Sequence, residues 1–216
     1  MNFFSHCHVA SWTRSDPAFA LGSMLPDFAT MSDGRLQGSS HADVQAGIAH
    51  HHETDAVFHA APTFVRLCGE SAARMEAEGV RWGTSRAVAH VGLELLLDGV
   101  LLHGGPPAVR DTYVRALRRA SPADLGTTLR WRSDASGARF DLVLRRLLDY
   151  GLPDEIGEPE IVFTRLVRIL GPRDRLRIEP EHQDPVRREI HRLAPDVRRD
   201  ADALMHEVRQ GLGAPG

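Results

Sequence analysis

One stretch of the sequence, residues 47–62, concentrates side chains of the kind that bind metal ions. It reads G-I-A-H-H-H-E-T-D-A-V-F-H-A-A-P and includes His51, Asp55 and His59. Positions four apart on an α-helix lie on one face, so these three side chains would form a polar ridge. An imidazole and a carboxylate on adjacent turns can hold one divalent cation from a rigid backbone. The alternative interpretation is a histidine-rich face that contacts solvent alone.

A second group of ligand-type residues lies in the apolar segment 86–103. His90, Glu94 and Asp98 follow one another at four-residue spacing among valines, leucines and glycines. An unpaired carboxylate buried in such a helix costs several kcal/mol, so a positive charge must compensate. We interpret the triple as part of a metal site, and the alternative is a network of ion pairs with arginines.

His6 and Asp27 complete the candidate set. His6 lies in an apolar N-terminal segment, and Asp27 follows Pro26 at the expected end of an apolar helix. Mixed histidine and carboxylate ligands suit Mn²⁺, Mg²⁺, Fe²⁺ or Zn²⁺, and among these we expect Mn²⁺. The predicted metal ligands are His6, Asp27, His51, Asp55, His90, Glu94 and Asp98. The predicted catalytic residues are His51, Asp55 and His59.

These residues must be positioned by helices, because the sequence predicts an all-α fold. No segment alternates with a period of two for long enough to indicate a strand. Residues 30–40, which are rich in glycine and serine, predict a loop. Apolar residues at helical spacing, separated by glycine and proline, predict helices at about 1–12, 18–25, 42–60, 62–79, 86–103, 107–120, 138–150, 158–170 and 184–212.

The length of 216 residues favours one all-α domain over residues 1–216. Within it, residues 1–105 carry the metal ligands and a net negative charge, whereas residues 106–216 are rich in arginine. The formal net charge of −3 argues against nucleic-acid binding. The chain contains no lysine, so its positive side chains are guanidinium groups, which suit phosphates and carboxylates. The arginine-rich half could therefore face an acidic partner.

The cellular compartment is predicted from the cysteines and the apolar segments. The two cysteines form no CxxC motif and no disulfide framework, which fits a reducing cytosol. We expect no signal peptide and no membrane span. The predicted localisation is cytoplasmic, and the oligomeric state is left open.

Four segments together resemble the acyl carrier protein phosphodiesterases, a family related to the HD-type metal phosphohydrolases. M-N-F-F-S-H at residues 1–6 resembles the family's M-N-[FY]-L-A-H opening. L-G-S-M-L-P-D-F at 21–28 resembles L-G-N-x-x-A-D-F. The segment 47–62 is similar to G-I-x-x-H-R-x-I-D-x-x-T-D-x-x-P, and L-E-L-L-L-D at 93–98 is similar to the start of L-D-x-x-x-D-H-F-L.

The resemblance implies an all-α, HD-like fold and a divalent-metal hydrolase. The implied reaction cleaves the phosphodiester that joins 4′-phosphopantetheine to a serine of acyl carrier protein. Carried over by position, the metal site would contain His6, Asp27, His51, Asp55, Glu94 and Asp98. The sequence also departs from the family pattern, because Gly99 stands in the place of a histidine and His59 in the place of an aspartate. His90 has no counterpart among the family's expected ligands.

The predicted function is therefore that of a metal-dependent phosphodiesterase or phosphohydrolase, with acyl carrier protein or a small phosphoester as substrate. In this interpretation a histidine, His59 or His52, donates a proton to the leaving alkoxide. One alternative is a metal-dependent hydrolase of another phosphoester, such as a nucleotide or a phospholipid head group. The other is a non-catalytic helical protein that binds a metal.

Overall fold

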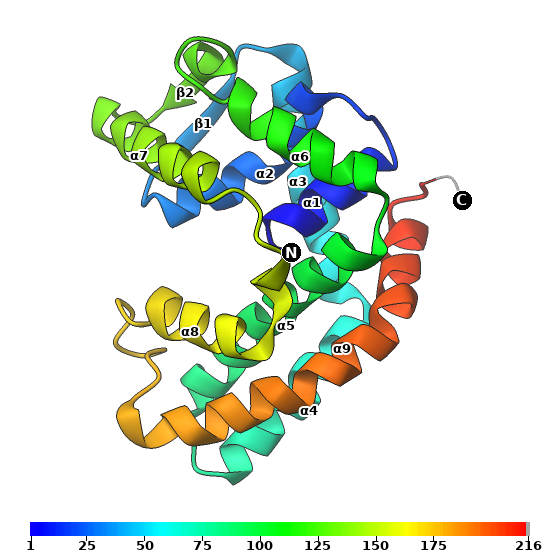
Figure 1. The fold of residues 1–216 in the computed structure, drawn as a ribbon, viewed down its shortest axis with the longest axis vertical. Helices are drawn as coiled ribbons and strands as arrows, with labels where there is room; N and C mark the ends of the chain where they lie inside the picture. The colour runs from blue at the N-terminus through cyan, green and yellow to red at the C-terminus, as the bar shows by residue number, and fades with distance from the viewer. Residues whose placement is uncertain (215–216) are drawn as a thin grey trace. The chain divides into compact units, whose positions relative to one another are not determined.

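The structure, a computed structural model, describes residues 1–214 and consists almost entirely of helices (Figure 1). Within that range it contains nine α-helices, three short 3₁₀ helices and one two-stranded sheet, which confirms the predicted all-α class. The last two residues of the predicted 106–216 half lie outside the described residues. The helices are α1 (Phe3–Ser11), α2 (Pro17–Met31), α3 (Ala42–Ala60), α4 (Pro62–Ala77), α5 (Trp82–Gly104), α6 (Pro107–Arg119), α7 (Asp134–Tyr150), α8 (Pro159–Leu170) and α9 (Gln183–Gly211), with η1 (Leu125–Thr128), η2 (Asp154–Gly157) and η3 (Pro180–His182).

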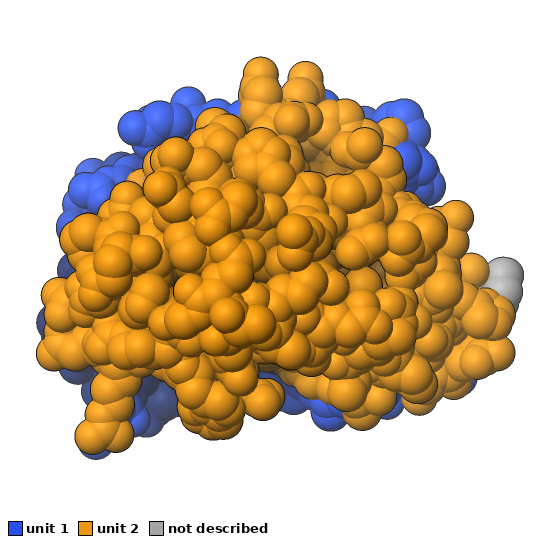
Figure 2. All heavy atoms as spheres, turned by 90° about the horizontal axis from the view of Figure 1, so that it is seen from below, with its two compact units in different colours: residues 1–57, 104–153, 212–216 blue, residues 58–103, 154–211 orange. Residues whose placement is uncertain are grey.

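Contacts between residues divide the chain into two compact units, coloured separately in Figure 2. Unit 1 contains residues 1–57 and 104–153, together with the end of the chain from Leu212. Unit 2 contains residues 58–103 and 154–211. Both units are discontinuous in sequence, since the chain passes from unit 1 to unit 2 and back. The organisation as one domain stays a prediction.

Unit 1 is built on α1, α2 and α6, which pack on one another. The α2 helix begins where the sequence predicts it: Asp16 accepts hydrogen bonds from the backbone amides of Ala18 and Phe19, and Pro17 occupies the first helical position. Phe3 of α1 stacks on Phe28 of α2 with ring centroids 4.5 Å apart. This core fixes the two helices that carry His6 and Asp27.

The predicted end of α2 at Pro26 is wrong, because the helix continues to Met31. Proline within a helix removes one hydrogen bond and usually bends or ends the helix. Here the residues after it are held by tertiary packing, since Phe28 is fully buried against Phe3. Asp27 therefore projects from a helix and not from a turn.

The loop predicted at residues 30–40 contains a short strand. The β1 strand (Leu36–Ser39) pairs antiparallel with β2 (Leu129–Trp131), and a register shift lies between Leu36 and Gly38. Strands of three and four residues are too short to show a period of two, which explains why the sequence pattern does not reveal them. Helix α7 packs beside this sheet in unit 1.

Unit 2 is held by the packing of α4 and α8 on α9. The Glu189 carboxylate of α9 is buried and receives a forked pair of hydrogen bonds from Arg74 of α4, with Nε and Nη2 2.7 to 3.1 Å from its oxygens. This forked guanidinium–carboxylate contact fixes the relative orientation of α4 and α9.

Helix α9 continues through Pro195, which lies inside it.

The α5 helix of unit 2 is predominantly apolar. Among the described helices it is the one that is long and apolar enough to cross a membrane by length and composition, and 61% of its most apolar window is buried inside the protein. The core helix of a globular unit passes the same test, so this is weak evidence for a span. The helix also carries Glu94 and Asp98, which are costly groups inside a bilayer.

Candidate metal centre

The first group of ligands lies in unit 1, where three helices bring four predicted residues together. His6 comes from α1, Asp27 from α2, and His51 and Asp55 from adjacent turns of α3. The close approach of α2 and α3 depends on two glycines. A Cβ atom on Gly47 would lie 2.2 Å from the carbonyl oxygen of Phe19 and 2.8 Å from the Cα atom of Gly22. No other residue type fits this crossing without moving the helices apart.

His6, Asp27 and His51 each offer a ligand atom within 4.8 Å of the others, and Asp55 lies beside both histidines. His6 Nε2 lies 3.3 Å from Asp55 Oδ1 and 3.6 Å from Asp27 Oδ2. His51 Nε2 lies 3.9 Å from Asp55 Oδ2 and 4.0 Å from Asp27 Oδ1. Ligand atoms that are each about 2.1 Å from one ion lie between about 3 and 4.2 Å from one another. The observed separations fall in that interval.

The orientation of His51 is fixed by a backbone group. Its Nδ1 atom lies 2.8 Å from the carbonyl oxygen of Ser23, which can only accept a hydrogen bond, so Nδ1 carries the proton. Burial lowers the pKa of His51, so the ring is neutral and Nε2 presents a lone pair. That lone pair faces the carboxylates of Asp27 and Asp55. A metal-ligating histidine is commonly oriented in this way by a carbonyl oxygen on its other nitrogen.

His6 is fully buried and stacks on His51, with ring centroids 4.0 Å apart. Among the described residues its Nδ1 has no hydrogen-bond partner, and its Nε2 has only a long contact of 3.3 Å to Asp55 Oδ1. Burial lowers its pKa to about 3, so the ring is neutral near pH 7. A buried imidazole without a hydrogen bond is costly, and its Nε2 atom is directed at two carboxylates. These are the properties of a side chain that fits a cation.

Asp55 is the residue that both histidines share. Burial alone would raise its pKa, but His6 and the positive charge of the Met1 amino group, 2.7 Å from Oδ1, hold the pKa below its usual range. The carboxylate is therefore ionised at neutral pH. An ionised oxygen donor beside two neutral nitrogen donors is a suitable ligand set for Mn²⁺, Fe²⁺ or Zn²⁺.

The second group lies in unit 2 and contains the other predicted pair. His59 Nε2 of α3 and His90 Nε2 of α5 each lie 3.1 Å from the same carboxylate oxygen, Glu94 Oε1. Burial would raise the pKa of Glu94, but these two histidines and nearby positive charge hold it well below its usual range. Six of the seven predicted ligands therefore lie in two groups, one in each unit.

Asp98 is buried in α5 and belongs to neither group among the described residues. Its role as a ligand stays a prediction. Packing explains why the neighbouring position 99 is a glycine, where the resembled family has a histidine. A Cβ atom on Gly99 would lie 2.4 Å from the Cα atom of Gly157 in η2, so a histidine does not fit at this position.

Sequence reasoning missed the role of Ser23, which acts through its backbone carbonyl. A carbonyl oxygen is present at every residue, so no residue type signals it. The tight crossing at Gly22 and Gly47 could have been found, because two glycines in facing apolar helices indicate a close backbone approach.

The comparisons with known proteins agree with the motifs. Residues 1–79 match the family model described as acyl carrier protein phosphodiesterase, which supports the resemblance indicated by the motifs. The matched segment contains all four ligands of the first group. The search among curated proteins and the search among solved structures each found no match.

Proposed function

We propose that this chain, whose first 79 residues match the acyl carrier protein phosphodiesterases, is a metal-dependent phosphodiesterase that releases 4′-phosphopantetheine from acyl carrier protein. The observation that carries the proposal is the orientation of His51. The Nδ1–H group of His51 donates to the carbonyl oxygen of Ser23. The Nε2 atom of His51 therefore carries no proton, and its lone pair faces the carboxylates of Asp27 and Asp55. A divalent cation, Mn²⁺ by preference, would accept this lone pair and bind both carboxylates.

The residues of unit 1 would divide the work between binding and proton transfer. His6, Asp27, His51 and Asp55 would hold the cation, which lowers the pKa of a water molecule and stabilises charge on a phosphoryl oxygen. His52 is exposed beside His51, with ring centroids 5.2 Å apart, so it can reach a substrate at this site and donate a proton to the leaving alkoxide. The catalytic role predicted for His59 stays a prediction, since His59 lies beside Glu94 in unit 2.

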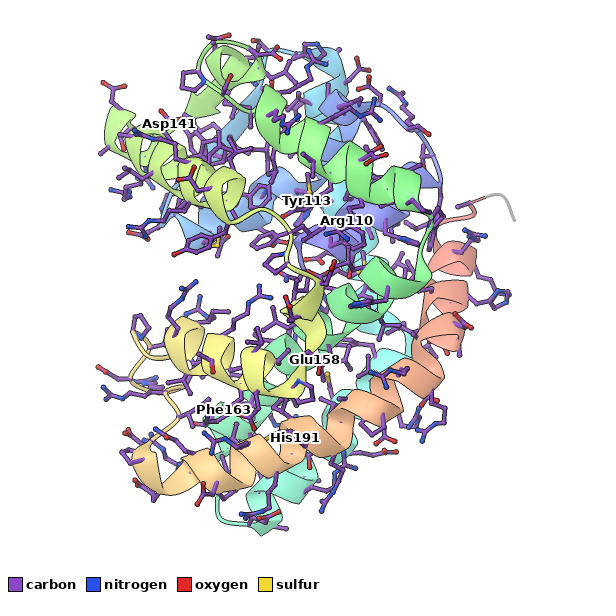
Figure 3. All side chains as sticks on the ribbon, in the orientation of Figure 1. Arg110, Tyr113, Asp141, Glu158, Phe163 and His191 are labelled. Atoms are coloured by element: carbon purple, nitrogen blue, oxygen red, sulfur yellow. The ribbon has the colours of Figure 1, made fainter. Side chains whose placement is uncertain are left out.

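The α6 helix supplies a surface on which an acidic carrier protein could dock. It packs against α1 and α2, which carry His6 and Asp27, and a pocket on it is lined by three arginines. These are Arg110, labelled in Figure 3, together with Arg115 and Arg118, and all three are exposed. Positive charge beside the site would guide an acidic partner to it and hold a phosphate group.

The experiment is hydrolysis of holo-acyl carrier protein by the purified chain with Mn²⁺, followed by mass spectrometry of the carrier protein. We expect a loss of the 4′-phosphopantetheine mass in the presence of Mn²⁺ and none with EDTA. Asp55→Asn keeps the shape of the ligand but removes its charge, and it should lower the rate by more than about 100-fold, since loss of an outer-shell partner alone costs 10–100-fold. The control is Asp43→Asn, an exposed aspartate on the same helix that pairs with Arg14.

The outcomes separate the alternatives. Cleavage of bis-p-nitrophenyl phosphate without cleavage of the carrier protein would keep the metal hydrolase but reject this substrate. Stoichiometric metal without turnover of either substrate would favour a non-catalytic metal-binding protein. Equal activity of Asp55→Asn and Asp43→Asn would reject the site.

A further inference from the structure

A second cluster of metal-binding side chains lies in unit 2, away from the residues that carry the proposed function. It contains His59 near the end of α3 and the pair His90 and Glu94 on adjacent turns of α5. His90 and Glu94 lie outside the segment that matches the family model. His90 also has no counterpart among the ligands implied by the resemblance. This cluster therefore needs its own explanation.

The distances within the cluster suit a small ion. Each of the two Nε2 atoms lies 3.1 Å from Glu94 Oε1, and one ligand atom of each residue lies within 4.8 Å of the others. Bonds of about 2.0 to 2.1 Å in a tetrahedral arrangement place neighbouring ligand atoms about 3.3 Å apart. A zinc ion could bind with shifts of a few tenths of an ångström in the side chains.

The surroundings hold the two imidazoles in place. The Phe64 ring of α4 meets His59 and His90 edge-on, with centroids 5.1 and 5.3 Å away, and the two imidazole centroids are 4.7 Å apart. The Glu94 side chain is 12% exposed, whereas His90 is 45% exposed. Because the two histidines are partly exposed, an ion can reach the more buried carboxylate from solvent. An ion bound at the two Nε2 atoms would require each ring to carry its proton on Nδ1.

The chemistry of the donors selects the ion. Two imidazole nitrogens and one carboxylate oxygen form a set that zinc enzymes use, with a fourth position left for water or another small ligand. Mg²⁺ prefers an octahedral shell of oxygen atoms and would bind such a site poorly. The first group, which has two carboxylates and two imidazoles, is richer in oxygen and should discriminate less between these ions.

We propose that His59, His90 and Glu94 form a second cation site, selective for Zn²⁺ over Mg²⁺, that ties the end of α3 to α5 within unit 2. The site is independent of the proposed phosphodiesterase activity. The competing explanation is that the three residues only hydrogen-bond to one another, as neutral histidines donating to Glu94.

The experiment measures Zn²⁺ binding in a chain whose first site is disabled by Asp27→Asn and His51→Gln. Isothermal titration calorimetry with Zn²⁺ alone should then show one binding site per chain. A 100-fold excess of Mg²⁺ should not displace the bound Zn²⁺. Adding His90→Gln to this background should weaken the affinity for Zn²⁺ at least tenfold. The matched control is His191→Gln, an exposed histidine of unit 2 that lies 2.8 Å from Glu160 without a second histidine (Figure 3).

The control variant should bind Zn²⁺ as well as its parent. Zn²⁺ should also raise the melting temperature of the control variant and leave that of the His90→Gln variant unchanged. If the disabled background does not fold, the same comparison in the otherwise unchanged chain should show a fall from two bound Zn²⁺ ions to one with His90→Gln.

Equal Zn²⁺ binding by the His90→Gln and His191→Gln variants would overturn the proposal, as would the absence of zinc at this cluster in a folded chain. Turnover is not part of this readout. Zinc bound here in a chain that hydrolyses no phosphoester would reject the proposed function and leave this inference standing.

Discussion

At the scale of residues, the candidate centre is recognisable by what its histidines lack. His6 is buried with no hydrogen bond to Nδ1 among the described residues and only a long contact from Nε2 to Asp55, and His51 directs a lone pair at two carboxylates. In the interior of a protein such groups are stable when a cation satisfies them. The distances and the orientation of the rings therefore indicate a metal more strongly than the residue types do.

The low pKa of His6 predicts a pH dependence of folding in the metal-free chain. Because burial lowers its pKa to about 3, the folded state binds no proton at His6 between pH 3 and about 6.5, whereas the unfolded chain does. The free energy of unfolding should therefore decrease as the pH falls through this window. Urea denaturation in EDTA at several pH values measures this slope, and His6→Gln should make it shallower. Identical slopes would mean that His6 is protonated in the folded chain.

Cys68 provides a second prediction at this scale. Burial, with a smaller contribution from Glu94, raises the pKa of its thiol to about 12. Because the thiolate is the reactive form, Cys68 should react with iodoacetamide at pH 8 far more slowly than the same thiol in the unfolded chain. Mass spectrometry of the tryptic peptides, with and without urea, measures this ratio. Modification of the folded chain as fast as the unfolded one would contradict the burial of the thiol.

The residue types of both groups were predictable from the sequence because an α-helix places residues four apart on one face. His51 with Asp55 and His90 with Glu94 follow that rule, and the structure brings each pair together. What the sequence does not reveal is which pairs from distant helices share a group. That depends on tertiary packing, and it places His59 beside Glu94 in unit 2.

At the scale of elements, the crossing of α2 and α3 sets the geometry of the first group. Gly47→Ala would place a methyl group 2.2 Å from the carbonyl oxygen of Phe19, so the helices must separate. We expect a loss of about 3 kcal/mol in stability, at the upper end of overpacking, and weaker Mn²⁺ binding. Thermal unfolding and metal titration measure the two effects.

The control for this substitution is Gly69→Ala in α4. No atom lies within 4 Å of the added methyl group there, so the higher helix propensity of alanine should stabilise the chain by about 0.5 to 1 kcal/mol. If both alanine variants were equally stable, the close approach of α2 and α3 would not exist in solution.

The contact between α4 and α9 gives a further prediction. Arg74→Ala would leave the buried carboxylate of Glu189 without its forked partner, and breaking such a pair costs about 3 kcal/mol. Arg192→Ala is the matched control, because Arg192 is exposed and lies 3.8 Å from the same carboxylate. Its loss should cost less than about 1 kcal/mol. Urea denaturation that gave equal losses for the two variants would contradict a dominant role for Arg74.

The elements themselves were largely predictable, and the exceptions have physical causes. Helix α3 begins and ends where the pattern of polar and apolar residues predicts. The continuation of α2 through Pro26 was not predictable, because it depends on the burial of Phe28 against a distant helix. The β1 and β2 strands escaped detection because each has too few residues to show its period.

At the scale of the whole molecule, the uneven distribution of charge supports a role in recognition. The proposed ligands of the first group lie in the acidic first half of the sequence, and the arginines of α6 belong to the second half, yet both contribute to unit 1. The sequence indicated an acidic partner for the arginines. It could not indicate that α6 packs on the helices of the metal ligands, because that contact joins residues about 100 positions apart.

The docking surface predicts a specific kinetic effect. Arg118→Glu should raise KM for the carrier protein about five- to tenfold with little change in kcat, because it removes attraction for an acidic partner and leaves the ligands intact. Arg146→Glu on α7, an exposed arginine outside the α6 pocket, is the control and should change KM by less than about twofold. An equal rise in both variants would indicate a general effect of net charge.

The proposed function requires one divalent cation among His6, Asp27, His51 and Asp55. The most direct measurement is anomalous diffraction at the manganese absorption edge from crystals of the chain grown with Mn²⁺. We expect a peak about 2.2 Å from the Nε2 atom of His51 and from a carboxylate oxygen of Asp55. A well-ordered structure with no anomalous peak among these four side chains would contradict it.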